Sequence, residues 1–558
     1  MDPAFCSGLE LSRFDFAKEW RATSNLLATS MKRYVDACRL LRDIYLEPTR
    51  VLDNTSPIWD VFNDMDRELT RLEAYQSELR QVRVEVSLIR NRSSKLAPVM
   101  LLPHEVLAYI FELVVITEYR GYRIQSRADK LPVDTHPTHP SALSSVCTYW
   151  RQITTNTPSL WGYINLVASG LNTQQSYARA SQFISRASNT PLFIRIHYQA
   201  PTSVTDDVQR LTNWLTPIAN RIYSLDMSGG RSSKEMLRSV LQCWFEHGTP
   251  GTVKELSIPY CACAEHEHYR FIEPTPALYR KSWKLDISPQ RFEEFFQPIV
   301  IVRLEGLFPP WNSQAYHGLI HLRLDTGRIK QAELMNLLSR NPQLRTLSFN
   351  LWITDRQSPW EPVAHVHLPR LEILNLKDMQ ITNVWMLLRL IDPGSSPLKL
   401  SLAISEEPWV NSSSLAHNED FLGFIRRSNV TALHLTGAMG AQDIWFPQFL
   451  SIFPRLHSLA LKNYSLTQRN TGEYDRVCLS LHVLCLISGE IEISLLERLL
   501  RVRSIQVLRV SGCETEGDGE PIEELPDTLS ALVPNVKCYR TSDRDCSDPY
   551  LNWGFVDF

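Results

Sequence analysis

Apolar residues in the first hundred positions recur at helical spacing. One series, at intervals of four and three, consists of Leu27, Met31, Tyr34, Cys38, Leu41 and Tyr45. The second consists of Ile58, Phe62, Met65, Leu69, Leu72, Tyr75, Leu79, Val82, Val86 and Ile89. Each series occupies one stripe of a helix, and charged residues fill the other faces of the second. We therefore predict two long helices, separated by a polar turn from Pro48 to Pro57.

Two arrangements of these helices are compatible with the pattern. In the first, they form an antiparallel hairpin and bury their stripes against each other. In the second, the later helix forms a coiled coil with another copy or with a partner. A short connection favours antiparallel neighbours, so the hairpin is the preferred prediction.

A different pattern begins near residue 190, where two apolar residues spaced two apart recur every 24 to 37 positions. The pairs are Leu225/Met227, Leu256/Ile258, Leu285/Ile287, Leu322/Leu324, Leu347/Phe349, Leu374/Leu376, Leu400/Leu402, Leu433/Leu435, Leu459/Leu461, Leu484/Leu486 and Leu508/Val510. In three copies a helical stripe, a break and then L-x-x-L-x-L follow in that order, as at residues 334–349, 449–461 and 495–510. Such a unit cannot cover its own apolar face, so neighbouring units stack into one continuous core.

This pattern resembles leucine-rich repeats and predicts an α/β fold, an irregular solenoid with parallel strands on the concave side and helices on the convex side. It departs from that family because Trp352, Met379, Tyr464 and Gly489 occupy positions where asparagine or cysteine is expected. The pair Val302/Leu304 adds a strand that is out of register with the others. Side chains between the strand leucines are expected to face the concavity and to bind a client protein. The candidates are Arg323, Asp325, Asn350, Asn375, Lys377, His434, Lys462 and Arg509.

Residues 97–166 contain three short motifs in a fixed order. The first, Leu102-Pro103-His104-Glu105-Val106-Leu107-Ala108-Tyr109-Ile110-Phe111, predicts a helix entered through a proline. The second, Val146-Cys147-Thr148-Tyr149-Trp150-Arg151, lies in a predicted amphipathic helix over 142–153. The third, Pro158-Ser159-Leu160-Trp161, precedes a short strand.

Together the three motifs resemble the F-box, in proteins of the fungal F-box-like type that carry an N-terminal helical segment. The resemblance implies docking onto the Skp adaptor of a cullin-based ubiquitin ligase. A helical cluster of this size cannot bury its whole apolar stripe, so an exposed patch is expected. The candidates for adaptor contact are Leu101, Leu102, Pro103, Val106, Leu107 and Ile110, whereas Trp150 and Trp161 are expected in the core.

One departure from the F-box pattern is a long insert, Thr117 to Pro140, between the first two helices. Its His136-Pro137-Thr138-His139-Pro140 run superficially suggests a metal site. Prolines on both sides favour a surface loop. The insert either makes a plain surface excursion or adjusts docking.

Composition narrows the possible partners. A formal net charge of -3 with both signs interspersed gives no basic surface for nucleic acid. No stretch approaches the roughly 20 apolar residues of a membrane span, and the first residues do not resemble a signal peptide. The 11 cysteines form no C-x-x-C pair, so free thiols in the cytoplasm or nucleus are expected.

Motifs for bond chemistry are missing from the sequence: there is no G-x-x-x-x-G-K-[ST], G-x-G-x-x-G, G-x-S-x-G or H-E-x-x-H. Cys261, Cys263, His266 and His268 carry zinc-binding side chains, but their alternate spacing makes tetrahedral closure awkward and favours a loop. We therefore predict a protein that is not an enzyme and has no catalytic residue, metal or cofactor.

The sequence thus predicts four segments: N-terminal helices over 1–96, an F-box-like module over 97–166, a repeat region over 167–540 and a tail over 541–558. The predicted function is a substrate-recognition adaptor of a Skp–cullin–F-box ubiquitin ligase, which binds an unidentified client protein. The alternative is a ligase-independent scaffold that self-associates through its N-terminal helices.

Overall fold

The computed structural model describes residues 3–46, 58–92, 98–125, 139–169, 173–198, 204–229, 234–258, 270–275, 283–355, 364–404, 418–437, 442–443, 452–466, 481–502, 505–515 and 527–539. The chain divides into two units, Met1–Met100 and Leu101–Phe558. No helix within the described ranges is both long enough and apolar enough to cross a bilayer.

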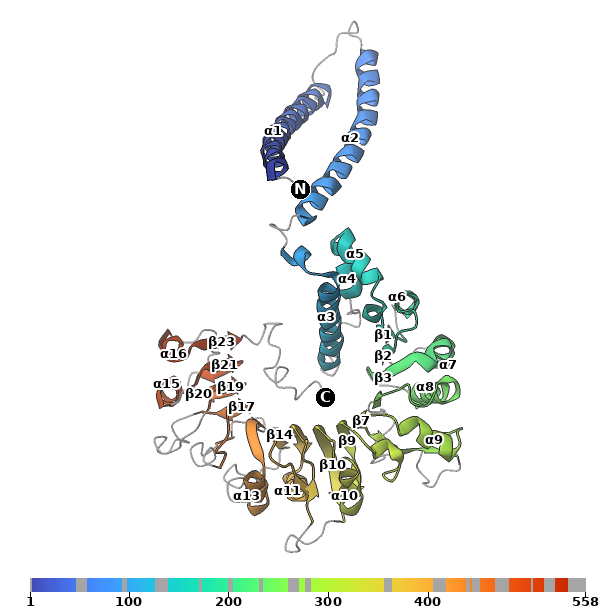
Figure 1. Ribbon diagram of the computed structural model, residues 1–558, viewed down its shortest axis with the longest axis vertical. Helices are drawn as coiled ribbons and strands as arrows, with labels where there is room; N and C mark the ends of the chain where they lie inside the picture. Colours follow the sequence, from blue (N-terminus) through green and yellow to red (C-terminus); the bar gives the residue numbers. More distant parts are fainter. Residues whose placement is uncertain are drawn as a thin grey trace. The chain divides into compact units, whose positions relative to one another are not determined.

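The first unit contains the two predicted long helices, α1 (Pro3–Leu46) and α2 (Ile58–Arg92) (Figure 1). The Tyr34 hydroxyl donates a hydrogen bond of 2.9 Å to Glu68 Oε1, from α1 to α2. Every described side chain of α1, from Phe16 to Asp43, is nevertheless exposed, and so are the apolar residues of α2 from Leu69 to Val86. The predicted mutual burial of the two stripes is therefore not seen at these positions.

The second unit is a mixed α/β structure around a parallel sheet of 14 described strands. The order of the strands across this sheet is the same as their order along the chain. The missing numbers belong to strands of four smaller sheets, which are described below. They are β1 (Tyr163–Val167), β2 (Leu192–His197), β3 (Ile222–Gly229), β4 (Glu255–Ile258), β7 (Ile301–Glu305), β9 (His321–Lys330), β10 (Thr346–Thr354), β12 (Ile373–Met379), β14 (Pro397–Ile404), β15 (Asn429–Thr436), β17 (Ser458–Lys462), β19 (Val483–Ile487), β21 (Val507–Ser511) and β23 (Asn535–Tyr539).

Helices connect most of these strands and lie along the outer side of the curved sheet (Figure 1). A parallel pair requires such a crossover, because its strands run in the same direction. The connecting helices are α6 (Thr173–Arg186), α7 (Val204–Leu215), α8 (Lys234–His247), α9 (Pro289–Phe296), α10 (Gln331–Ser339), α11 (Ile381–Leu390), α13 (Glu419–Arg427), α15 (Ile493–Val502) and α16 (Asp527–Leu532). Short 3-10 turns are η4 (Thr216–Arg221) and η6 (Gln314–Tyr316).

The strand leucines form the core that the sequence pattern predicts. In β9 both Leu322 and Leu324 are buried, and in β14 so are Leu400 and Leu402. One predicted pair is wrong, however. Leu285 ends the short strand β6 (Trp283–Leu285), which is outside the large sheet. The pair that sequence spacing marked as out of register, Val302/Leu304, supplies β7 of the large sheet.

The error has a physical cause. Leu285 and Ile287 are buried like true repeat residues, but Leu285 is the last residue of β6 in a three-stranded sheet of order β6-β5-β8, and Ile287 follows that strand. That sheet contains β5 (Arg270–Pro274) and β8 (Leu307–Phe308). Apolar spacing reports burial and does not distinguish which sheet a strand joins.

Three further sheets of the described residues have two strands each. They pair β11 (Val366–His367) with β13 (Ile391–Asp392), β16 (Gln442–Asp443) with β18 (Tyr464–Ser465), and β20 (Glu490–Ile491) with β22 (Glu514–Thr515).

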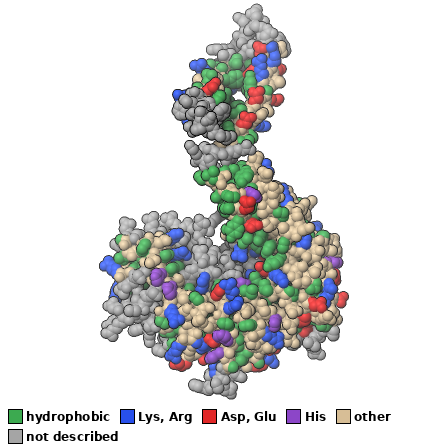
Figure 2. Space-filling view, in the orientation of Figure 1, with side chains coloured by type: hydrophobic (Ala, Val, Ile, Leu, Met, Phe, Trp, Pro, Cys, Tyr) green, Lys and Arg blue, Asp and Glu red, His purple; other side chains and the backbone are tan. Residues whose placement is uncertain are grey.

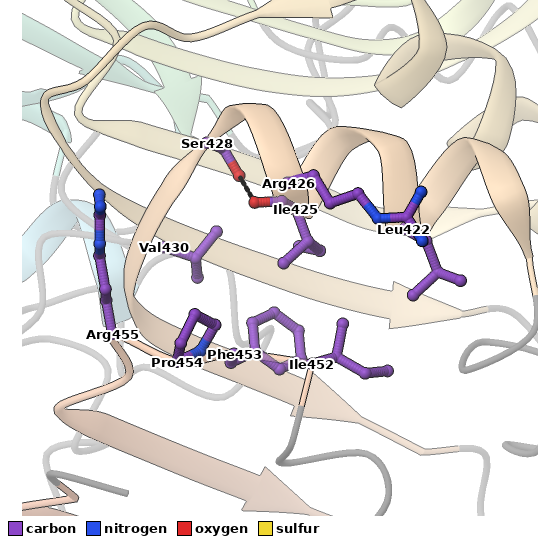
Figure 3. A pocket seen from close by; sticks show the side chains of 9 residues that line it. All are labelled: Leu422, Ile425, Arg426, Ser428, Val430, Ile452, Phe453, Pro454 and Arg455. Atoms are coloured by element: carbon purple, nitrogen blue, oxygen red, sulfur yellow. Dashed lines mark hydrogen bonds between the residues drawn. The ribbon is translucent and has the colours of Figure 1, made fainter.

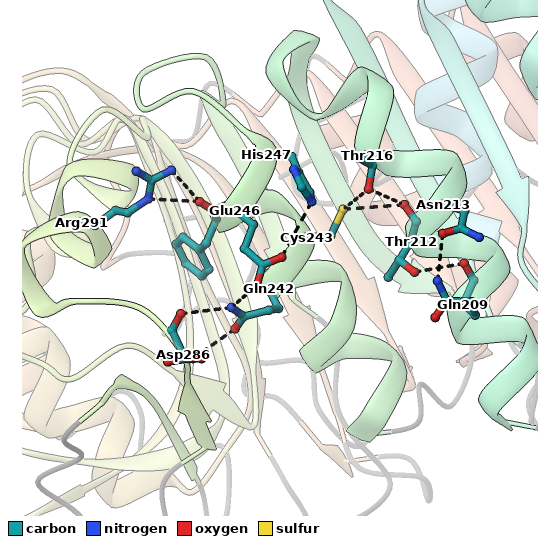
Figure 4. A network of polar contacts seen from close by, with 11 residues as sticks. Gln209, Thr212, Asn213, Thr216, Gln242, Cys243, Glu246, His247, Asp286 and Arg291 are labelled. Atoms are coloured by element: carbon teal, nitrogen blue, oxygen red, sulfur yellow. Dashed lines mark hydrogen bonds and ion pairs between the residues drawn. The ribbon is translucent and has the colours of Figure 1, made fainter.

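Polar contacts join successive outer helices in addition to apolar packing (Figure 4). Gln242 of α8 donates from Nε2 to the Asp286 carbonyl and accepts from the Asp286 amide, both at 3.1 Å. The Arg291 guanidinium of α9 donates to the Phe245 carbonyl at 2.9 and 3.2 Å, which satisfies a carbonyl near the end of α8. These contacts fix the spacing between α8 and α9.

Gly489, between β19 and β20, marks a close approach of two backbones. A Cβ at this position would lie 2.1 Å from the Tyr464 carbonyl oxygen and 3.1 Å from its carbon. Because backbone atoms cannot move aside as a flexible side chain does, we expect Gly489→Ala to lower the free energy of unfolding by about 1–3 kcal/mol. Chemical denaturation measures this. Gly423→Ala is the control: the nearest atom to its Cβ is a side-chain nitrogen of Arg427 at 3.4 Å, and alanine favours a helix interior, so stability should not fall.

Candidate protein-docking surfaces

The first candidate surface is built on α3 (His104–Gln125), which follows η1 (Pro98–Leu101). Four residues of α3, at intervals of four, are buried: Leu107, Phe111, Val115 and Tyr119. Their stripe packs on the following helices, and the Phe111 ring lies 4.7 Å from that of Trp150. This face of α3 is therefore part of the core of the second unit.

The other side of α3 carries apolar side chains that the described residues leave exposed. Val106 is 42% exposed, Tyr109 61%, Ile110 37% and Leu113 46%, and Leu101 is exposed just before the helix. We call these five residues the α3 apolar face. Figure 2 shows hydrophobic side chains gathered in this part of the second unit. An exposed apolar cluster on one helical face is typical of a surface that binds another protein.

Four of the six residues predicted for adaptor contact are exposed: Leu101, Pro103, Val106 and Ile110. Leu102 is half-buried and packs against the core. The prediction for Leu107 is wrong, because its side chain is completely buried. It begins the stripe that Phe111 and Val115 continue, so it faces inward. Tyr109 and Leu113 were missed, although their spacing of three from Val106 and Ile110 places them on the same face.

The predicted second helix is broken at Cys147 into α4 (His139–Val146) and α5 (Thr148–Thr155). Cys147 has extended backbone angles, and its sulfur accepts a hydrogen bond from the Trp150 amide at 3.5 Å. The residue therefore caps α5. Trp161, in η3 (Pro158–Trp161), is fully buried as predicted, and its Nε1 donates to the Thr154 carbonyl at 2.8 Å. Trp150 is half-buried against the same core.

The expected insert is shorter than the sequence suggested, because α3 continues to Gln125 and α4 begins at His139. Residues 126–138 of the predicted insert, including His136, lie outside the described residues. Across the junction, the Glu118 carboxylate accepts from the His139 amide at 3.1 Å, and its Oε2 lies 2.6 Å from His139 Nδ1. His139 therefore has a carboxylate partner on α3, at the start of α4.

Buried polar contacts attach α3 to the large sheet. Arg195 of β2 is fully buried, with its Nε 3.1 Å from Asp226 Oδ2 of β3. Its Nη1 donates to the Tyr119 carbonyl at 2.9 Å, and its guanidinium lies 4.4 Å from the centre of the Tyr119 ring. Closer to the start of α3, Glu112 accepts a hydrogen bond from the Ser159 hydroxyl. The helix is thus held at two points along its length, Glu112 and Tyr119, which fixes the α3 apolar face relative to the sheet.

The second candidate surface is the inner side of the large sheet. Strand register places one residue from every strand in a continuous row: Asn165, Arg195, Asp226, Ser257, Arg303, Arg323, Ser348, Asn375, Ser401, His434, Ala460, Cys485, Arg509 and Lys537. We call this the central row. Both neighbours of each member along its strand point to the opposite face, where the leucines are buried.

Four of the eight predicted client-binding residues are in the central row: Arg323, Asn375, His434 and Arg509. Three others, Asp325, Asn350 and Lys462, lie two residues later on the same side of their strands. The side chain of Lys377 lies outside the described residues. The row residues from Asn165 to Arg303 were missed, although counting strand positions from β9 back to β1 reaches them.

Three of the side chains predicted to bind a client are not exposed in the concavity. Asn375, His434 and Asp325 are buried. His434 Nδ1 lies 2.8 Å from the Ser401 hydroxyl and its Nε2 lies 3.0 Å from the Thr436 hydroxyl, while Asp325 pairs with Arg323. Strands about 4.8 Å apart bring row neighbours within hydrogen-bonding distance, so short polar side chains bind each other.

Arginines surround His321, two residues before the central row on β9. Burial lowers the pKa of His321 from its ordinary 6.5 to about 4, and the positive charges of Arg303, Arg345 and Arg120 act in the same direction. The folded protein therefore resists protonating this imidazole.

A pH dependence of stability follows. The unfolded chain binds a proton at His321 below about pH 6.5 and the folded chain does not until about pH 4, so stability is lost as pH falls through this window. We expect His321 to lower the free energy of unfolding by about 1 kcal/mol at pH 5 relative to neutral pH, after allowing for partial solvent screening. His321→Gln should flatten the pH profile of the unfolding free energy between pH 6.5 and 4. An unchanged profile would contradict the assignment.

A recess of about 360 Å³ lies between α13 and the approach to β17 (Figure 3). Its floor is aliphatic and aromatic, with Ile425, Val430 and Phe453, and Arg426 and Arg455 line it as well. The Ser428 hydroxyl donates to the Ile425 carbonyl at 3.4 Å and so caps the end of α13. The described residues that line the recess include no carboxylate or imidazole, and the recess resembles a packing gap between neighbouring repeats.

Metal-ligating side chains do not gather anywhere in the described ranges: no group of three or more histidine, cysteine, aspartate or glutamate residues could hold an ion there. Cys261, Cys263, His266 and His268 lie outside these ranges. No family model matches the chain, and no curated protein matches it either. The assignment of function therefore depends on the two surfaces themselves.

Proposed function

We propose that this chain is a substrate-recognition adaptor, in which F-box-like helices bind a Skp-type adaptor of a cullin ubiquitin ligase. In this proposal the large sheet and its outer helices are an irregular leucine-rich-repeat solenoid that binds a client protein. No residue of the chain carries out bond chemistry. The observation that supports it most directly is the α3 apolar face, on a helix whose opposite side belongs to the core.

Sequence and structure support this proposal independently. The motif Leu102 to Phe111 resembles the first F-box helix, and the exposed positions Val106 and Ile110 fall within it. An apolar face that is left open while its own helix is firmly anchored suits binding between preformed surfaces. The clamp of Arg195 and Asp226 on Tyr119 then transmits the adaptor's position to the sheet.

The repeat assignment has support of the same kind. Within the described residues, fourteen parallel strands follow in chain order, outer helices lie between most of them, and leucines next to the central row are buried. Each strand and its outer helix contact chiefly the neighbouring strands and helices, as in a quasi-one-dimensional repeat array. Arg323, Asn350, Lys462 and Arg509 are the partly exposed members of the predicted client set, so they remain our candidates for client contact.

The experiment that tests the proposal is co-purification of the full chain with a Skp-type adaptor, followed by identification of further captured proteins by mass spectrometry. Stoichiometric recovery of the adaptor supports the ligase role. Recovery of other partners with no adaptor would contradict it and favour a ligase-independent scaffold.

A further inference from the structure

We propose that α2 binds a second copy of this chain as an antiparallel pair of helices, related by a two-fold axis at Leu79. The proposal concerns the first unit and does not depend on adaptor docking. It starts from the exposed stripe of α2. Seven apolar residues follow the stripe and are 37% to 72% exposed: Leu69, Leu72, Tyr75, Leu79, Val82, Val86 and Ile89.

The chain's own α1 does not cover this stripe. The hydrogen bond from Tyr34 to Glu68 places α1 near α2, yet every described residue of α1 is exposed as well. A 35-residue helix with an uncovered apolar stripe gains most from pairing with another amphipathic helix. The occupant is identified by the distribution of charge along α2.

Charge is divided unequally about Leu79. Residues 64–78 contain five acidic and two basic side chains, whereas residues 80–90 contain three basic and one acidic. Parallel pairing of two copies would set acid against acid and base against base. Antiparallel pairing sets the acidic half of each copy against the basic half of the other, which favours a second copy in this orientation.

The apolar spacing fits the same axis. Intervals of three and four place Leu69 and Leu72 in one heptad register and Val82, Val86 and Ile89 in another, and Leu79 belongs to both. With the axis at Leu79, Leu69 lies opposite Ile89 and Leu72 lies opposite Val86. Tyr75 lies against Val82, and Leu79 meets its own copy.

Flanking charges are complementary in this register. Glu73 faces Arg83 of the second copy and Asp66 faces Arg90, and the two-fold axis repeats each pair. Opposite charges beside an apolar seam set helix orientation and partner choice. The geometry therefore selects the antiparallel homodimer over a parallel one.

Charge reversal tests this register. Sedimentation velocity of the full chain is expected to show a dimer. Glu73→Arg and Arg83→Glu, taken singly, place like charges opposite each other twice and should each raise the dissociation constant about tenfold. Combining them restores opposite charges and should restore the dimer. Arg67→Glu, whose 72% exposed side chain lies on the face of α2 away from the stripe, is the matched control and should leave the dimer unchanged.

Cysteine cross-linking tests the orientation. In the antiparallel dimer, Leu79→Cys forms a disulfide between two copies of residue 79, identified as a linked peptide by mass spectrometry. Leu69→Cys forms no such link to its own copy, because Ile89 lies opposite it. A monomeric wild-type chain, failure of the double reversal to restore the dimer, or a 69-to-69 link would each overturn the proposal. None of these outcomes bears on adaptor binding.

Discussion

Replacing Val106 and Ile110 together by aspartate is expected to reduce binding of the Skp-type adaptor at least 100-fold. Both side chains are on the α3 apolar face, where an interface would surround them with apolar atoms. An aspartate there must lose its water without gaining a partner, and central interface positions commonly cost 2 kcal/mol or more each. The adaptor affinity of the full chain, measured by calorimetry, checks this result.

The same substitution should leave the fold intact, since the wild-type side chains are 42% and 37% exposed. An unchanged thermal midpoint would separate loss of the interface from unfolding. Val84→Asp is the matched control, because Val84 is an exposed valine on α2. Leu107→Ala gives the contrasting behaviour: it creates a cavity in the core, so it should lower stability by about 2–5 kcal/mol. Undiminished adaptor affinity of the double aspartate variant would contradict the proposed docking face.

Sequence patterning was sufficient wherever burial on one side determined the element. Most of the large sheet's strands follow from apolar spacing alone, because their regular stripe has few other ways to be buried. The same kind of spacing located the two N-terminal helices, although their described stripes are exposed. The break at Cys147 did not follow. Its extended backbone angles depend on a thiol capping the Trp150 amide, a contact that apolar spacing does not encode.

The candidate site was predicted in part for a similar reason. The motif from Leu102 to Phe111 located the correct helix, but dividing its residues between core and surface requires knowing where the rest of the module packs. Leu107 was therefore placed on the wrong side. Likewise, the chain gives no local signal that His434 lies between Ser401 and Thr436, because 33 residues separate His434 from Ser401.

Asp226→Ala is expected to destabilise the second unit by about 3–5 kcal/mol. The variant removes the carboxylate beside the fully buried Arg195 guanidinium and leaves a positive charge without that compensation in the core. Because Arg195 also donates to the Tyr119 carbonyl, the loss should spread to α3. Hydrogen exchange of amides in β2, β3 and α3, together with chemical denaturation, measures both effects.

Two further variants separate the charge from the packing. Asp226→Asn retains the shape and an acceptor oxygen, so it should destabilise the unit less than alanine does. Asp226→Leu combined with Arg195→Met removes both charges, and such replacements are often nearly neutral for stability. The hydrogen bond to Tyr119 would still be absent, so α3 amides should exchange faster even where global stability recovers. Asp226→Ala within 1 kcal/mol of wild type would show that the pair does not hold α3 to the sheet, and the α3 apolar face would then have to be positioned by core packing and the Glu112–Ser159 contact.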